Sequence, residues 1–173
     1  FAKWRDMRLK EVAPASVIRE MQLMSSVLTV ARRDWELIGV NPLSDVRKPA
    51  KPPARDRLPT LAEIEAMQFS AGEDLEKATA RAFHAFKFAM VTAMRAGEIA
   101  SLDWDRVDLD RRVALLSHTK NGRPREVPLS TRAVELLREL PDLDPVFGLS
   151  SRQLDVLLRK LRDRAGVARL TFH

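Results

Sequence analysis

The apolar residues in the first part of the chain recur three or four positions apart, which is the spacing of one face of a helix. Pro14 suits the first turn of such a helix, and Gly39 suits the left-handed residue that ends it. The spacing therefore predicts a long amphipathic helix between these two residues. Its apolar face comprises Val17, Met21, Met24, Leu28, Ala31, Trp35 and Ile38. Residues 1–13 show no comparable pattern.

Two more helices are predicted further along. Thr60 and Glu63 have the spacing of a capping box, so a helix is expected over residues 61–69. A longer helix is expected over residues 74–93. Its predicted buried side comprises Ala82, Phe83, Phe86, Ala89, Met90 and Ala93. His84 lies in the middle of this helix among apolar neighbours, so we expect it to be a structural histidine rather than a ligand or a base.

After this helix the apolar pattern changes from a helical period to that of strands. Short strands are predicted over residues 107–109, 113–119 and 125–129. Asn121-Gly122, between the last two, is a strong signal for a tight hairpin, and Pro128 indicates an edge strand. These features predict a small three-stranded antiparallel sheet.

The C-terminal part returns to helical spacing. Ser130 is expected to cap a helix over residues 131–140, and Ser150 is expected to cap another. The inward face of the latter comprises Leu154, Leu157, Leu158 and Leu161, and Gly166 is expected to end it. The pattern as a whole predicts a mainly α protein with one small antiparallel sheet, an α+β fold.

The composition narrows the classes of function. The chain has 173 residues, of which 45% are hydrophobic and 31% are charged, as is typical of a globular protein. It has no cysteine, which excludes disulfides, thiolate catalysis and thiolate metal sites. Its three histidines are far apart and lack ligand spacing, so no metal site is expected. No apolar run is long enough to span a membrane.

The formal net charge is +6, which favours an anionic partner, nucleic acid ahead of an anionic membrane. A basic, proline-rich stretch over residues 46–57 follows the first helical region. Proline makes such a segment extended and stiff. The stretch is either a solvated connector or a basic strand along a phosphate backbone, and its composition leaves both open.

The stretch from Thr92 to Trp104 is the strongest candidate for chemistry. Arg95 follows the apolar helix at once, and Glu98 comes three residues later. A guanidinium is always charged and presents a planar fork of donors that suits a phosphate or a carboxylate. Arg95 is therefore expected to meet an anion, either Glu98 in a structural ion pair or a bound phosphate.

Three motifs, in this order, resemble those of the tyrosine recombinases, the phage integrase family. The stretch around Arg95 resembles the family's first catalytic box, and the predicted hairpin resembles the β-hairpin that carries its catalytic lysine, here Lys120. Leu170-Thr171-Phe172-His173 resembles the lead-in to the second box. Each motif is moderately specific, and the ordered set is more so.

The resemblance implies a domain organisation and the integrase catalytic fold. Residues 1–48 resemble the end of the family's helical core-binding domain. Residues 49–57 are then a basic, proline-rich linker, and residues 58–173 are a catalytic domain that is incomplete at its C-terminus. Both ends of the chain are expected to have been cut from a longer protein.

The family breaks and rejoins DNA by transferring a backbone phosphoryl group to a tyrosine hydroxyl, without a metal or a cofactor. Fixed cations must then stabilise the charge on the non-bridging oxygens. The resemblance implies that Arg95 is one of two such arginines. It also implies that Lys120 protonates the departing 5′ oxygen, and that His173 donates to the phosphate or shuttles a proton. Glu98 is expected to support the site.

The same resemblance implies double-stranded DNA as the partner and favours contact between the linker and the DNA backbone. The expected DNA-binding residues are Lys48, Lys51, Arg55, Arg57, His118, Thr119, Arg123 and Arg125. The complete protein is expected to act as a homotetramer on paired DNA sites of phages or other mobile elements, with or without DNA-bending accessory proteins. Its expected location is the bacterial cytoplasm, in association with the nucleoid.

The chain departs from the family in one respect. It contains no tyrosine, and the family's layout places the second arginine and the nucleophile beyond His173. Residues 1–173 alone are therefore not expected to cleave DNA. The alternatives are a non-enzymatic DNA-binding protein on the same fold, a type IB topoisomerase with the same chemistry, and a generic basic helical protein.

Overall fold

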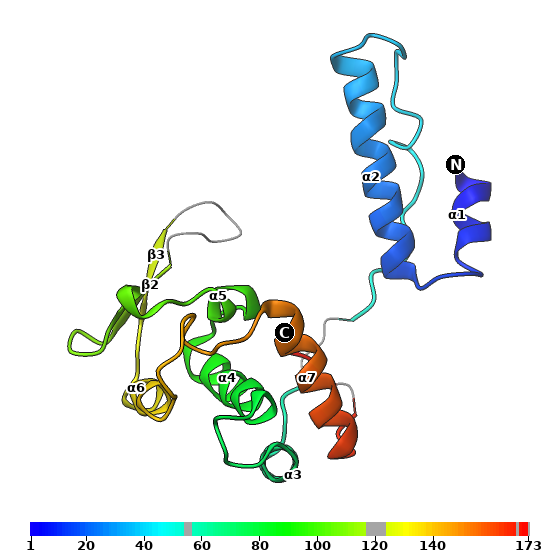
Figure 1. Ribbon diagram of the computed structural model, residues 1–173. Helices are drawn as coiled ribbons and strands as arrows, with labels where there is room; N and C mark the ends of the chain where they lie inside the picture. The colour runs from blue at the N-terminus through cyan, green and yellow to red at the C-terminus, as the bar shows by residue number, and fades with distance from the viewer. Residues whose placement is uncertain (54–56, 117–123, 169, 173) are drawn as a thin grey trace. The chain divides into compact units, whose positions relative to one another are not determined.

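The computed structural model describes residues 1–53, 57–116, 124–168 and 170–172 (Figure 1). The chain forms two compact units, Phe1–Asp56 and Arg57–His173. The end of the second predicted strand, residues 117–119, and the predicted Asn121-Gly122 turn lie outside the described residues.

The first unit contains α1 (Ala2–Arg8) and α2 (Pro14–Arg33). The sequence pattern did not predict α1, because this short helix has no fully buried residue and packs only half-buried Trp4 against the core of the first unit. It is held to α2 by the side chain of Arg8, whose Nε lies 2.9 Å from a carboxylate oxygen of Glu20. Pro14 occupies the first turn of α2, as predicted.

The end of α2 is a correction to the prediction. The helix ends at Arg33 rather than near Gly39, and Glu36 takes the left-handed conformation, with φ of 53°. Trp35 consequently lies outside the helix and is exposed. The physical reason is tertiary: the buried side-chain amide of Asn41 donates to the carbonyl oxygen of Ser25 at 3.1 Å and pins the returning chain against α2.

The second unit holds the remaining helices and the sheet. Its helices are α3 (Leu61–Ala71), α4 (Ala78–Thr92), α5 (Ala96–Ala100), the 3-10 turn η1 (Trp104–Arg106), α6 (Thr131–Arg138) and α7 (Ser151–Arg164). Its strands are β1 (Val107–Asp108), β2 (Val113–Leu116) and β3 (Arg125–Pro128), in the order β1-β2-β3 and antiparallel throughout. This arrangement is the mainly helical fold with a small sheet that the sequence predicted, and Pro128 lies on an edge strand as expected.

The predicted helix starts and stops follow local hydrogen bonds. The Thr60 amide donates to the Glu63 side chain at 2.9 Å, and the Thr60 hydroxyl accepts from the Glu63 amide, so the capping box that begins α3 is confirmed. Ser150 and Gln153 form the same arrangement at the start of α7. Helix α7 ends just before Gly166, as predicted, and Gly166 takes the left-handed conformation with φ of 67°.

The start and the buried face of α4 are corrections. The helix begins at Ala78, four residues later than predicted. Met90 and Ala93 are exposed, whereas Ala85 and Phe88 are fully buried. The reason is that α3, α6 and α7 all contact α4, so its buried surface is broader than one apolar stripe and lies nearer its middle (Figure 1).

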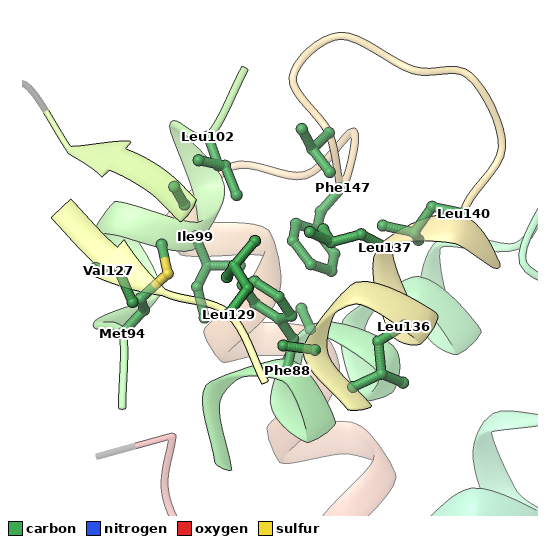
Figure 2. Packing of buried hydrophobic residues seen from close by; sticks show 14 of the residues in the cluster. Phe88, Met94, Ile99, Leu102, Val127, Leu129, Leu136, Leu137, Leu140 and Phe147 are labelled. Carbon is green, nitrogen blue, oxygen red and sulfur yellow. The ribbon is translucent and has the colours of Figure 1, made fainter. Parts of the chain in front are cut away.

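A continuous core joins α4, α5, the sheet and α6. Figure 2 shows Phe88 of α4 among Ile99, Leu129 and Leu137, with Phe147 from the loop that precedes α7. The rings of Phe88 and Phe147 have centroids 5.4 Å apart. The short helix α5 is therefore fixed on one side by this core. Among the helices of the described residues, none is both long and apolar enough to cross a membrane.

Candidate active site

Arg95 lies at the junction between α4 and α5. Helix α4 ends at Thr92, and Ala93 takes the left-handed conformation with φ of 53°, which redirects the chain. This conformation costs a non-glycine residue about 1–2 kcal/mol, and the burial of Met94 in the core offsets the cost. Arg95 then precedes the first turn of α5, and its side chain is 52% exposed.

Glu98 holds Arg95 in two ways. One carboxylate oxygen of Glu98 accepts a hydrogen bond from the Arg95 backbone amide at 2.8 Å, which satisfies a donor at the start of α5. The other accepts from Nη1 of Arg95 at 3.0 Å. The Glu98 side chain is only 5% exposed, so this carboxylate is a fixed part of the protein interior.

Arg125 is the third member of the cluster. It opens β3, and its Nη2 donates to a carboxylate oxygen of Glu98 at 2.9 Å. Arg125 was expected from the family resemblance to contact DNA, and its pairing with Glu98 was not predicted. Strand alternation places Arg125 on the same face of β3 as buried Val127, two positions on, but the spacing does not show that Glu98 lies opposite this face.

The electrostatics of the cluster keep Glu98 ionised. Burial raises the pKa of this carboxyl group. The hydrogen bond from the Arg95 amide, together with those from the Arg125 and Arg95 side chains, outweighs burial and holds the pKa below its ordinary value. Two guanidiniums around one carboxylate leave one surplus positive charge at a half-exposed position. Such a cluster can bind a phosphate.

Of the remaining predicted site residues, the structure describes Lys48, Lys51 and Arg57. Lys48 and Lys51 are exposed in the first unit. The guanidinium of Arg57 forms an ion pair with Glu63, next to the α3 cap. The other predicted residues, Lys120, His173, Arg55, His118, Thr119 and Arg123, lie outside the described residues.

His84 has the environment of a structural residue. It is buried in α4, and its ring bonds to the carbonyl oxygen of Leu136. The described parts of the chain contain no group of three or more histidine, aspartate or glutamate residues placed to hold a metal ion.

Comparison with known proteins gives this geometry a context. The profile of the phage integrase family matches residues 60–173. A Haemophilus influenzae protein named "Putative integrase/recombinase" is 41% identical to the chain, over 100% of the chain and 50% of that protein. The Escherichia coli shufflon-specific DNA recombinase is 37% identical, over 81% of the chain and 38% of the recombinase. The chain thus spans about half the length of the Haemophilus protein.

The fold agrees with solved structures. A lambda integrase dimer bound to a COC′ core site matches with a TM-score of 0.75 and 20% identity, over 99% of this chain and 65% of the integrase chain. At this identity the likeness shows the fold alone, and the fold is the one predicted. Because the family profile covers most of the chain and includes the Arg95 cluster, we conclude that the chain belongs to the phage integrase family, the tyrosine recombinases.

Proposed function

We propose that the complete protein is a site-specific DNA recombinase, which cleaves and rejoins duplex DNA through a 3′-phosphotyrosyl intermediate. One observation carries the proposal: the half-exposed guanidinium of Arg95 is held by buried Glu98 in a cluster with a surplus positive charge. Such a cation is suited to the non-bridging oxygens of a scissile phosphate. Relatives that are named as recombinases support the same activity.

The proposed chemistry divides the roles among the motifs. Arg95 stabilises the extra negative charge of the transition state, and loss of one such fixed donor typically costs ~10²–10³ in rate. Lys120 protonates the 5′ oxygen as it leaves, and His173 donates to the phosphate or relays a proton. Because this chain contains no tyrosine, the nucleophile has to be supplied from outside residues 1–173.

The proposed partner is double-stranded DNA. Lys48 and Lys51 are exposed and can lie along a phosphate backbone, whereas Arg57 has to share its charge with Glu63. We further propose a homotetramer on paired sites, DNA-bending accessory proteins where the site requires them, and action on the nucleoid in the bacterial cytoplasm. The DNA-bound and tetrameric states of lambda integrase structures support the partner and the assembly.

The test uses the complete protein with duplexes selected from random-sequence DNA by binding. A nick placed next to the cleavage position traps the covalent adduct, which is detected by denaturing gel electrophoresis. We expect an adduct at the 3′ phosphate that is lost in Arg95→Gln and weakened in Arg95→Lys, because lysine lacks the planar fork. Arg159→Gln is the control, since Arg159 pairs with Asp155 on the surface of α7.

Each outcome discriminates between functions. DNA binding with no adduct at any selected site indicates a DNA-binding protein without catalysis. Relaxation of supercoiled DNA without exchange between two sites indicates a type IB topoisomerase. Exchange between paired sites that depends on Arg95 supports the recombinase.

A further inference from the structure

The pair formed by Glu98 and Arg125 links two elements that are distant in the chain. Arg125 lies 27 residues after Glu98, on the strand that leads out of segment 117–123, which contains Lys120. One Glu98 oxygen accepts from both Arg125 Nη2 and the Arg95 amide, and the other accepts from Arg95 Nη1. A single buried carboxylate therefore sets the positions of both arginines.

The charges in this cluster require the second arginine. With Arg95 alone, buried Glu98 would neutralise the one cation that has to face a phosphate. With Arg125 present, the carboxylate is shared and the cluster keeps a net positive charge. A hydrogen bond to a charged group is also stronger than a neutral one, so the shared carboxylate holds both side chains firmly.

We propose that Arg125 is a positioning residue for strand cleavage: it acts on Arg95 through Glu98, and it anchors the start of β3 to α5. The inference rests on the proposed function for its kinetic part. The positioning role replaces the role of DNA contact that the family resemblance implied for Arg125. The side chain of Arg125 is 43% exposed, so the competing role for this residue is a direct contact with a DNA phosphate.

The kinetic test is a double-mutant cycle in the complete protein, with Glu98→Gln, Arg125→Gln and both together. Single-turnover cleavage of the trapping duplex is measured at saturating protein, and DNA affinity is measured separately. We expect Arg125→Gln to slow cleavage about tenfold with less than about a twofold change in affinity, because the residue acts through the site and not through DNA. In the Glu98→Gln background, the same substitution should cost less than about twofold.

Arg125→Lys and Arg159→Gln complete the series. Lysine keeps the charge but not the fork, so it should recover part of the cleavage rate. Arg159→Gln should cleave at the wild-type rate. Additive losses in the cycle would show that Arg125 does not act through Glu98. A loss of affinity with a salt slope reduced by about one would show that Arg125 contacts DNA. Either result would overturn the proposal.

A second readout does not depend on cleavage. The side-chain Nε–H signal of Arg95 is followed by NMR in the complete protein without DNA. We expect Arg125→Gln to shift or broaden this signal, because both arginines are bonded to Glu98. The proposal includes no direct contact between the two arginines. Arg159→Gln should leave the signal unchanged. An Arg95 signal unaffected by Arg125→Gln overturns the inference. A wild-type protein that forms no adduct, but shows the NMR effect, contradicts only the proposed function.

Discussion

Nε2 of His84 donates a hydrogen bond to the carbonyl oxygen of Leu136 across 2.7 Å and so ties α4 to α6. The histidine is 2% exposed. Burial lowers the pKa of its imidazole, and the positive charge of Lys87 acts in the same direction. The bond to Leu136 opposes this change without cancelling it.

We predict that protonation of His84 in the unfolded chain destabilises the protein in mild acid. Because the folded pKa is lower than the unfolded value of about 6.5, the contribution of neutral His84 to stability is complete above about pH 6.5. It is lost as the pH falls below that value towards the folded pKa. Urea unfolding between pH 8 and pH 5 should show this slope, and His84→Gln should flatten it. A folded-state NMR titration midpoint at or above that of a histidine peptide would contradict the prediction.

Glu98 is predicted to contribute to stability at neutral pH. Its pKa is depressed in the folded protein, so its contribution is complete above the unfolded value of about 4.3 and is lost as the pH falls through the folded pKa. Glu98→Ala should lower the free energy of unfolding at pH 7 by about 1–3 kcal/mol, because the buried carboxylate that accepts three hydrogen bonds, two of them from guanidiniums, is removed. Glu65→Gln, at an exposed position of α3, is the control. Equal losses in the two variants would argue against a special role for Glu98.

Ser150→Ala should destabilise α7. The Ser150 hydroxyl accepts from the amide of Gln153, and removal of such a cap costs about 1 kcal/mol. Ser151→Ala is the matched control, since Ser151 is the next residue, is exposed and lies in the first turn. Urea unfolding should separate the two variants. If Ser151→Ala costs as much as Ser150→Ala, the cap is not the cause.

The aromatic contact in the core should be measurable as a coupling. Phe88→Ala is expected to cost about 3–5 kcal/mol, because the side chain is fully buried. A cycle with Phe147→Ala should give a coupling energy of about 0.5–1.5 kcal/mol for the two rings. Phe69→Ala should change stability by less than about 0.5 kcal/mol, since Phe69 is 91% exposed. Strictly additive losses at 88 and 147 would indicate that the rings do not interact.

The basic linker should determine part of the salt dependence of DNA binding. Replacing Lys48 and Lys51 by glutamine is expected to lower the slope of log affinity against log salt by up to about 2, one phosphate contact for each lysine. Arg57→Gln should have a smaller effect, because Arg57 is already paired with Glu63. Lys77→Gln serves as the control, since Lys77 pairs with Asp74 on the surface. An unchanged slope in the double variant would mean that this part of the linker does not touch DNA.

The sequence was informative wherever one local interaction decides the structure. The capping residues Thr60 and Ser150, the end of α7 before Gly166 and the order of the three antiparallel strands, with Pro128 on an edge strand, agree with the prediction. Local spacing also singled out Arg95 and Glu98, which are one helical turn apart and in contact.

The sequence was uninformative where distant residues decide. Helix α2 ends early because Asn41 bonds to the carbonyl oxygen of a serine 16 residues before it. The ion pair of Arg125 with Glu98 spans 27 residues, so spacing alone could not indicate it. Helix α1 has no fully buried residue and packs only half-buried Trp4 against the core of the first unit, so it leaves no apolar period to detect.

The bond between Glu98 and Arg125 also bears on recombination between homologous genes. The two residues lie on separate segments, α5 and β3, which a crossover can separate. A chimaera could take its β-hairpin from a relative that has no cation at the position of Arg125. In that chimaera the Glu98 carboxylate would pair with Arg95 alone and would neutralise its charge. Swaps of hairpins between family members are therefore expected to succeed only when the partner residues are inherited together.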